Sequence, residues 1–312
     1  MRQEPAGQPL CRWRRQPFPP GGGGRSLESS PGDQRPGTGR QRSRRHRPPD
    51  LEGVVLMNRC VALIQARMSS NRYPGKVLEP LCDIPMISFM VNRVRRSRLL
   101  DEVVVVTSTD STDDLLAAHL ERERIAFFRG DLHDVLHRYF AAAQAHAAQE
   151  YVRLTGDCPL IDPEVLDSVI SLRRSAGADY ASNIDPPTYP DGLDCECFTR
   201  ETLQRAHSAA RSGPEREHVT LWMRSPDAAL VRLNRPAPCD ASMLRLTVDY
   251  PDDLVAVRRI VELLAPNRHF DFFDILRVVD QHSEITSLNP HVRNEWQSRH
   301  RAGCTSALEQ ES

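Results

Sequence analysis

The sequence predicts an α/β fold, with a mostly parallel sheet that carries helices on both faces and a small lobe in its second half. From residue 60 to residue 155, short apolar strands alternate with stretches in which apolar residues recur at helical spacing. One strand, Glu102 to Thr107 (EVVVVT), is an almost unbroken β-branched run, which is typical of a strand covered on both faces. Repeated strand–helix units of this length imply right-handed crossovers and an open sheet.

The elements are predicted in chain order from apolar period and from turn residues. A helix over 85–97 follows from Ile87, Met90 and Val94 on one face, and a helix from residue 111 has Asp113 and Asp114 in its first turn, where the helix dipole favours carboxylates. The predicted strands are 61–65, 102–107, 125–128, 151–155, 179–183, 193–198, 229–233 and 244–248. The other predicted helices are 132–148, 200–210, 214–223, 252–264 and 271–281.

The first 56 residues differ from the rest of the chain. They hold 11 Arg against five acidic residues, 9 of the 16 Gly and 9 of the 24 Pro, and they show no apolar period. Such a segment cannot bury enough apolar surface to offset its chain entropy. It is a disordered tail, a targeting peptide, or upstream sequence translated from an early start. We therefore predict an extension at 1–56, a folded domain at 57–285 and a C-terminal tail at 286–312.

Charge and hydropathy exclude several classes of function. The part after residue 56 has 30 basic and 37 acidic residues, so a nucleic-acid partner is not expected. The sequence contains no apolar run of 18 residues, so no membrane span is predicted. The eight cysteines form no CxxC pair and no signal peptide is evident, which favours reduced thiols and a cytoplasmic location.

The loop after the first strand, Gln65 to Lys76, combines cations, hydroxyls and a Pro-Gly turn. Backbone N–H groups and cations in a strand-to-helix loop form a cradle for a polyphosphate. The loop matches neither GxxxxGK[ST] nor GxGxxG. Lys76 is the single Lys beside 40 Arg, and an ammonium fits between phosphate oxygens where a planar guanidinium does not. The alternative is that the single Lys stands at this position by chance and has no role in binding phosphate.

Two aspartates, Asp157 and Asp249, each follow an apolar strand and precede a proline. Together they could bind Mg²⁺, which takes one or two carboxylates and completes its octahedron with phosphate and water. The alternative for Asp249 is helix N-capping. His133 and His137 have a spacing that can bind zinc, but no third ligand stands out, so we expect one exposed and one packed histidine.

Polar residues of the second half are candidates for binding a second substrate. Asp194 and Glu196 lie on one face of a predicted strand, where they are either solvated or hydrogen-bonded to substrate hydroxyls. Arg216, Glu217 and His218 are consecutive on a predicted helix, so at most two of them can reach one ligand.

Six motifs in order resemble the cytidylyltransferase family that includes CMP-acylneuraminate and CMP-Kdo synthetases, and in particular its spore-coat polysaccharide branch. They are IQARMSSNRYPGKVL, GDLHDVLHRY, RLTGDCPLIDP, YPDGLDCECF, REHVT and LRLTVDYPDDL, within residues 58–282. The resemblance implies a Rossmann-like nucleotide-diphospho-sugar transferase fold with an acceptor-binding lobe, and Mg²⁺-dependent transfer of CMP from CTP to a sugar or sugar acid in surface polysaccharide biosynthesis. Tyr73, Asn71 and Leu221 depart from the branch's pattern, which leaves the acceptor open.

The resemblance also implies roles for particular residues. The catalytic residues would be Arg67, Lys76 and Asp157; the nucleotide-binding residues Ala66, Arg67, Ser69, Arg72, Lys76, Asp134 and Arg138; and the metal ligands Asp157 and Asp249. From the polar residues of the second half, we expect Asp191, Asp194, Glu196, Arg216 and His218 to bind the acceptor. We expect CTP and a sugar-type acceptor as partners, and a homodimer. Two alternatives remain, a glycosyltransferase of similar sheet architecture that consumes a sugar nucleotide and a nucleotide-binding regulatory module without turnover.

Overall fold

The structure, a computed structural model, describes residues 59–288 except residue 268. The predicted extension at 1–56 and the predicted tail from residue 289 onward lie outside the described residues. The strands of the main sheet are β1 (Cys60–Gln65), β4 (Glu102–Ser108), β5 (Phe127–Gly130), β6 (Glu150–Thr155), β7 (Tyr180–Ser182), β8 (Glu196–Thr199) and β9 (Arg232–Asn234). A separate antiparallel pair is formed by β2 (Pro80–Leu81) and β3 (Ile84–Pro85).

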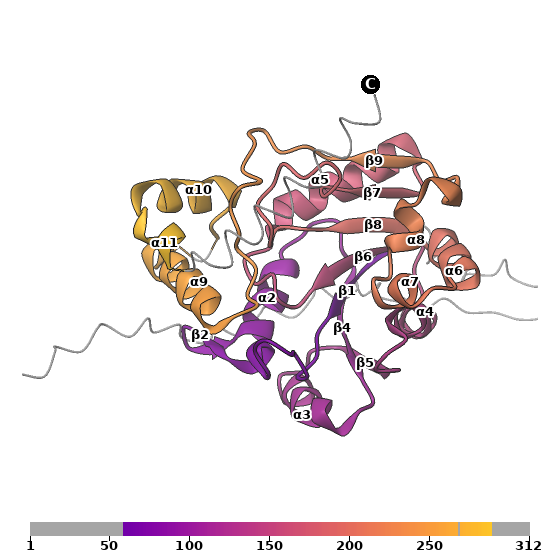
Figure 1. The fold of residues 1–312 in the computed structure, drawn as a ribbon, viewed down its shortest axis with the longest axis horizontal. Coiled ribbons are helices and arrows are strands. Elements are labelled where there is room, and N and C mark those ends of the chain that lie inside the picture. Colours follow the sequence, from indigo (N-terminus) through magenta and orange to yellow (C-terminus); the bar gives the residue numbers. More distant parts are fainter. Residues whose placement is uncertain (1–58, 268, 289–312) are drawn as a thin grey trace, which may run out of the picture.

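The main sheet has the strand order β5-β4-β1-β6-β8-β7-β9 (Figure 1). β8 runs antiparallel to its neighbours β6 and β7, and the other neighbouring strands are parallel. This confirms the predicted mostly parallel sheet. The segment after residue 178, which we expected to form a lobe, extends this same sheet through β8, β7 and β9.

Helices cover both faces of the sheet. One face packs against α2 (Met86–Val94), α3 (Asp114–Arg122), α5 (Pro163–Ala176), α9 (Pro251–Leu264) and α10 (Phe272–Gln281). The other face packs against α4 (Val135–Ala145), α6 (Arg200–Ala209) and α8 (Leu221–Arg224). The remaining helical elements are α7 (Gly213–Glu217), α11 (Glu284–Ser287), η1 (Lys76–Leu78), η2 (Ser111–Asp113) and η3 (Pro226–Ala228).

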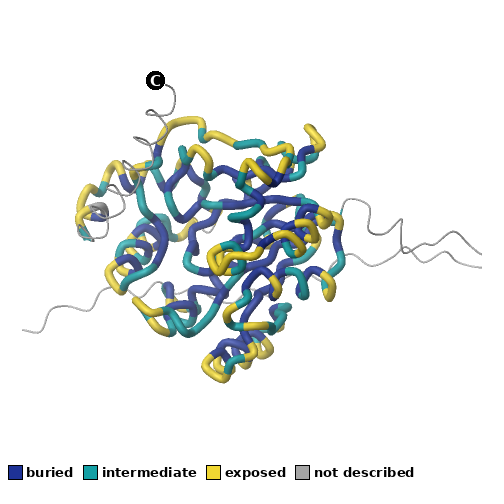
Figure 2. The backbone as a smooth tube through the Cα atoms, turned by 45° about the vertical axis from the view of Figure 1, so that its right-hand side comes forward, coloured by how far each residue is buried: buried dark blue, intermediate teal, exposed yellow. Residues whose placement is uncertain are grey.

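The β-branched run of β4 explains this two-sided burial. Val103 and Val105 belong to the apolar cluster on one face, whereas Val104 and Val106 belong to the cluster on the other. Figure 2 shows the buried backbone concentrated in the interior of the molecule, with exposed residues mainly at its periphery. Because full burial of a valine contributes about 1.5–3 kcal/mol, a polar residue at any of these positions would destabilise a face of the core.

The chain reverses direction across the sheet beside β1. β1, β4 and β5 follow one another outward, whereas β6 returns to the opposite side of β1. Gln65 and Thr155, the last residues of β1 and β6, pair directly. Ligands of open α/β sheets bind beyond the carboxyl ends of the strands at such a reversal. The loops after Gln65 and Thr155 therefore mark the expected site.

Four predictions for individual elements were wrong. The segment 244–248 is not a strand, because its backbone bonds join it to loops: Leu246 N donates to Asp191 O at 2.6 Å and Val248 N donates to Asp157 O at 2.8 Å. The predicted helix 214–223 divides into α7 and α8, with Val219 between them at φ 54°. The predicted strands 193–198 and 229–233 begin later, as β8 and β9.

A fifth prediction that was wrong concerns the histidines at the start of α4. His133 precedes the helix, and both it and His137 are exposed, so neither is packed as we expected of one of them. His137 Nδ1 instead lies 3.0 Å from His207 Nε2 on α6. Among the described residues, no helix combines the length and the apolar character needed to cross a membrane.

Candidate active site

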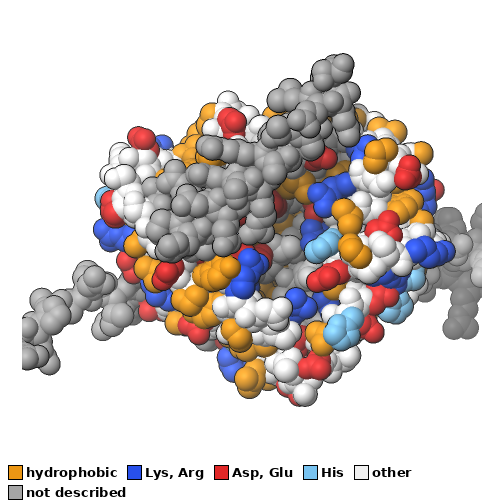
Figure 3. Space-filling view, viewed as in Figure 1, with side chains coloured by type: hydrophobic (Ala, Val, Ile, Leu, Met, Phe, Trp, Pro, Cys, Tyr) orange, Lys and Arg blue, Asp and Glu red, His pale blue; other side chains and the backbone are white. Residues whose placement is uncertain are grey.

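A cavity of about 230 Å³ opens where β1 and β6 end. Its walls come from the loop after β1, the loop after β6 and the segment before α9, and are formed by Gln65, Ala66, Arg67, Ser70, Asn71, Arg72, Lys76, Val77, Thr155, Gly156, Asp157 and Asp249. Figure 3, which shows the face seen in Figure 1, has acidic and basic side chains intermingled around its centre. The polyphosphate cradle predicted from the loop sequence therefore lies at the edge of a cavity with charges of both signs.

The loop after β1 is held in shape by bonds to its own backbone and to Asp113 of η2. Gly75 N donates to Met68 O at 2.9 Å, and Gly75 has φ 76°, which glycine adopts without strain. Met68 N donates to the buried Asp113 carboxylate at 2.7 Å. Together these bonds close the loop and bring Lys76, the first residue of η1, to the cavity.

Lys76 is the central cation of the site. Its Nζ donates to Val248 O at 2.6 Å and to Asp249 Oδ1 at 2.9 Å, and it lies 3.4 Å from Asp157 Oδ2. The residue is only 7% exposed. The single lysine of the chain thus connects the two carboxylates that the sequence singled out.

Asp157 is placed by a tight approach between the ends of β1 and β6. Gly156 N donates to Gln65 O at 2.8 Å, and a Cβ on Gly156 would lie 3.0 Å from both that oxygen and Ala66 Cβ. A larger residue would push the two loops apart. Burial acts to raise the pKa of Asp157, but the charge of Lys76 and the bonds from Thr155 and Lys76 outweigh it, so the pKa lies below its ordinary value.

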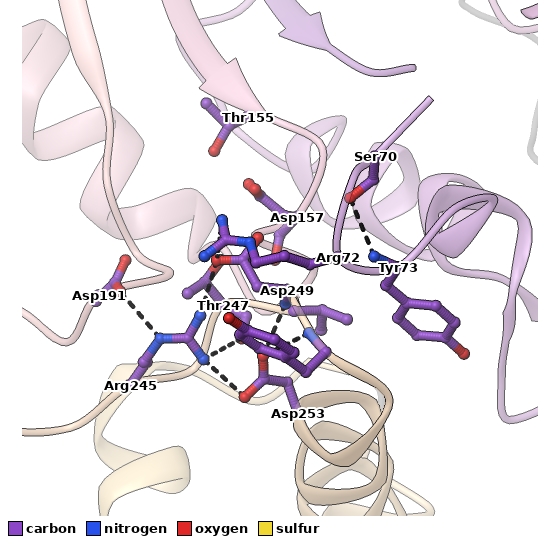
Figure 4. Close-up of polar contacts among 12 residues, drawn as sticks. Ser70, Arg72, Tyr73, Thr155, Asp157, Asp191, Arg245, Thr247, Asp249 and Asp253 are labelled. Atoms are coloured by element: carbon purple, nitrogen blue, oxygen red, sulfur yellow. Dashed lines mark hydrogen bonds and ion pairs between the residues drawn. The ribbon is translucent and has the colours of Figure 1, made fainter. Parts of the chain in front are cut away.

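Asp249 contacts three cations. Besides Lys76, Arg245 lies 2.8 Å and Arg72 lies 3.1 Å from Asp249 Oδ2. Arg245 also contacts Asp253 at 2.6 Å and Asp191 at 3.6 Å (Figure 4). Asp253 in turn accepts from the backbone N of Asp249 at 2.8 Å, which fixes the turn into α9. Asp249 therefore does not cap α9, because Asp253 forms the capping contacts.

The residues present fit a divalent cation held jointly with a ligand. A cationic nitrogen already lies within 3.4 Å of an oxygen of both Asp157 and Asp249, so the two carboxylates are close enough to share one cation. Within the described part of the chain, no group of three or more His, Cys, Asp or Glu could hold a metal alone. Such a site suits Mg²⁺, which is bound through one or two carboxylates together with substrate phosphates.

Comparison with known proteins agrees with this geometry. The sequence model of a family described as cytidylyltransferase matches residues 61–252. The chain belongs to the cytidylyltransferase family. It is 35% identical over 214 residues to the spore coat polysaccharide biosynthesis protein SpsF of Bacillus subtilis, and the match covers 66% of this chain and 88% of SpsF.

Solved structures show the same fold. A cytidylyltransferase from Leptospira borgpetersenii superposes with a TM-score of 0.69 and 31% identity, over 73% of this chain and 96% of that one. A CMP:2-keto-3-deoxy-manno-octonic acid synthetase complexed with CTP superposes with a TM-score of 0.53 over 66% of this chain and 99% of that one, and its 19% identity shows the fold alone. This cytidylyltransferase therefore has the predicted Rossmann-like nucleotidyltransferase fold and is a nucleotidyltransferase enzyme.

Not all predicted nucleotide-binding residues of this cytidylyltransferase reach the cavity. Ala66, Arg67 and Arg72 line it, and among the described residues the Arg67 guanidinium has no hydrogen bond or ion pair, so it can turn to a ligand. Ser69 is not part of the lining, where Ser70 stands instead.

Two further predicted residues, Asp134 and Arg138, lie on α4. Asp134 caps the helix through a bond from His137 N at 2.8 Å, and its Oδ2 pairs with Arg216, 3.0 Å from Arg216 Nε. We had predicted that Asp134 binds the nucleotide and that Arg216 binds the acceptor. Arg138 is fully buried and donates from one nitrogen to the Asp131 and Leu132 carbonyls, whereas its Nε and second terminal nitrogen have no partner among the residues that the structure describes.

The predicted acceptor-binding residues are distributed over β8 and its surroundings. Glu196 is buried and is bound by Arg153 and by the Tyr180 hydroxyl at 2.7 Å, so its charge is balanced within the protein. His218, at the end of α7, is exposed. Within the described residues, Arg216 is the member of the predicted triplet Arg216, Glu217 and His218 that forms an ion pair, and its partner is Asp134 at the start of α4.

Asp191 and Asp194 are closer to the carboxylates of the cavity. Burial raises the pKa of Asp191 to about 6, with Arg245 opposing and the other aspartates reinforcing the shift. Burial, and then the charges of Asp191 and Glu196, raise the pKa of Asp194 to about 8. With a pKa of about 8, the Asp194 carboxyl group is mostly protonated near neutral pH. Because it has no hydrogen bond or ion pair within the described residues, it can donate a hydrogen bond to a ligand.

Sequence reasoning missed several residues of the site. Gln65 and Thr155 line the cavity, and the buried Gln65 Oε1 has no hydrogen-bond partner in the described part of the chain, so it can accept a bond from a ligand. Arg245 and Asp253 fix Asp249 from behind. The position of Gln65 and Thr155 at strand ends could have revealed them, but nothing in the sequence distinguishes Arg245 from the other 39 arginines.

Proposed function

We propose that this protein is a Mg²⁺-dependent enzyme that transfers CMP from CTP to a sugar, a sugar acid or a related acceptor and releases pyrophosphate. The observation that carries the proposal is the convergence of Lys76, Asp157 and Asp249 at the cavity beyond β1 and β6. The similarity to SpsF favours an acceptor used for a surface polysaccharide. We further propose that the catalytic unit spans residues 57–285 and acts in the cytoplasm as a homodimer.

In the proposed reaction an oxygen of the acceptor attacks the α-phosphorus of CTP in line. The new oxygen–phosphorus bond forms while the bond to the bridging oxygen of the β-phosphate breaks, and pyrophosphate leaves. Catalysis of this kind is mainly positioning and electrostatic stabilisation. Lys76, Arg67 and Arg72, which all line the cavity, would bind the phosphates and stabilise the charge that develops on pyrophosphate.

Asp157 and Asp249 would hold the metal ion. When bound, Mg²⁺ neutralises phosphate charge and orients the triphosphate. Arg245 keeps the Asp249 carboxylate in one orientation, because it is itself fixed by Asp191 and Asp253. Gln65 Oε1, which has no partner within the described residues, would accept a hydrogen bond from the nucleotide or the acceptor. The nearby Thr155 hydroxyl would donate or accept one.

The proposed acceptor site is the region of Asp191 and Asp194. A protonated Asp194 donates a hydrogen bond and Asp191 accepts one, and this pairing suits the hydroxyl groups of a sugar-type acceptor. Asp194→Asn should keep the donor and therefore raise the KM of the acceptor only slightly. Asp194→Ala, which removes the donor, should raise it by about tenfold.

The decisive experiment measures pyrophosphate release by the full chain with Mg²⁺. CTP, UTP, ATP and GTP are each tested against sugar acids, sugar phosphates and sugars. Release with CTP and one acceptor supports the proposal and names the acceptor. A nucleoside diphosphate product formed from a sugar nucleotide, without pyrophosphate, would identify a glycosyltransferase instead.

Variants connect the activity to the carboxylates. Asp249→Asn should reduce turnover by at least about 100-fold, because it removes half of the charge that holds the metal. Asp252→Asn is the matched control, since Asp252 lies in the first turn of α9 but is exposed, and it should keep turnover within about twofold of the unmodified protein. Equal rates for the two variants would contradict the metal assignment.

A further inference from the structure

Lys76 occupies a position that a metal ion would need. Its ammonium is the cation that connects Asp157 and Asp249 in the described part of the chain, and it also bonds the carbonyl of Val248 between them along the chain. The side chain is 9% exposed, so water screens these contacts poorly. Two partly buried carboxylates this close would repel each other without a cation between them, and Lys76 supplies that cation.

The other cations at Asp249 differ from Lys76 in ways that matter. Arg245 is 8% exposed, contacts three carboxylates and does not line the cavity, so it is fixed behind the site. Arg72 lines the cavity but is 46% exposed, and its ion pair is with Asp249. Lys76 combines burial, contact with both carboxylates and direct access to the cavity.

We propose that Lys76 is a built-in counter-ion that fills the divalent-cation site until a nucleotide draws it away. The proposal rests on the proposed function, since it takes Asp157 and Asp249 as the metal ligands. Phosphate oxygens in the cavity offer Lys76 new partners, and as its ammonium turns to them it vacates the space between the carboxylates. Metal and triphosphate therefore bind cooperatively, and the protein without nucleotide binds a divalent cation only weakly.

The physical basis is a competition between cations for the same oxygens. A monovalent ammonium and a divalent ion cannot both lie between Asp157 and Asp249, because like charges at such short range repel strongly in a partly buried site. Any ligand that removes the ammonium raises the affinity for the metal by the same factor by which the metal raises the affinity for that ligand. The flexible stem of a lysine permits the exchange.

The test measures Mn²⁺ binding to the nucleotide-free full chain, by following the loss of the free-ion electron paramagnetic resonance signal. Lys76→Met should bind Mn²⁺ at least about tenfold more tightly than the unmodified protein. Arg72→Met is the matched control, because it also removes a cation from Asp249, and its affinity should change by less than about threefold. An unchanged or weaker affinity in Lys76→Met, or an equal gain in both variants, overturns the proposal.

Further variants keep the result interpretable. Lys76→Gln retains a donor for Val248 O, so it replaces Lys76→Met if the latter does not unfold cooperatively on heating, and it should show the same gain. Adding Asp157→Asn to either variant should abolish the gain, and a gain that survives would place the metal elsewhere and refute the exchange. Absence of pyrophosphate release by the unmodified chain refutes the proposed function, whereas the Mn²⁺ measurement tests the counter-ion separately.

Discussion

Asp113 is predicted to control the loop that carries Lys76. It is fully buried at the start of α3, and its Oδ2 accepts from Ser108 N and Thr107 Oγ1, each at 3.0 Å, and from the Ser108 hydroxyl. Its Oδ1 accepts from Met68 N at 2.7 Å. In Asp113→Asn, an amide oxygen that keeps the three β4 donors turns the NH₂ group toward Met68 N–H. The substitution therefore selectively releases the loop after β1.

The expected loss of unfolding free energy is about 3 kcal/mol. About 2 kcal/mol comes from the lost charge-assisted bond and the buried Met68 N–H that is left without a partner. About 1 kcal/mol comes from the weaker bonds that a neutral amide oxygen accepts from β4. Because the loop lines the cavity, the apparent KM for CTP should also rise by about tenfold.

The assay is urea denaturation of the full chain, together with pyrophosphate release at varied CTP. Asp114→Asn is the control: Asp114 is the next residue, its side chain is 62% exposed and it pairs with Arg129, so the loss should stay below about 1 kcal/mol. If Asp113→Asn unfolds within about 0.5 kcal/mol of Asp114→Asn, the reasoning from buried bonds is refuted.

Two further predictions concern the second half of the chain. Gly192→Ala should destabilise the protein by about 2–4 kcal/mol, because φ is 112° and the new Cβ would lie 2.7 Å from backbone atoms of Leu246 and Thr247. Gly213→Ala, which meets no atom within 4 Å, should change thermal stability little, and equal effects would be contrary to this account. The raised pKa of Asp194, about 8, means that the folded protein binds the extra proton, so stability falls as pH rises from about 4 to about 8 by at most about 1.4 kcal/mol per pH unit. Asp194→Asn should remove this term in urea titrations at pH 5, 7 and 9, and a stability difference that does not grow with pH would refute the shift.

Much of the fold follows from local sequence. The β4 run EVVVVT indicates burial on both faces because β-branched residues at successive positions point to opposite sides of a strand. The segment 244–248 shows the limit of such reasoning, since LRLTV alternates apolar and polar residues as a half-buried strand does, but bonds to two loops. An alternating pattern reports that a segment is extended and half-buried, and it does not report which backbone accepts its hydrogen bonds.

The candidate site could be predicted where chemistry is concentrated in short motifs. Lys76 stood out as the single lysine, and Asp157 and Asp249 stood out because each ends an apolar stretch before a proline. Asp113 and Asp114 did not stand apart from each other, because both favour the first turn of a helix. Only burial separates the residue that fixes the loop from the one that faces solvent.

The sequence by itself determined the α/β fold, the polyphosphate loop and the residue types of the site, because these depend on patterns a few residues long. Only the tertiary structure decided which charges meet. Lys76 pairs with Asp157 and Asp249 across 81 and 173 residues, and Arg216 pairs with Asp134 across 82. Such pairs are set by the crossovers that bring distant strand ends and helix ends together, and a linear pattern carries no record of them.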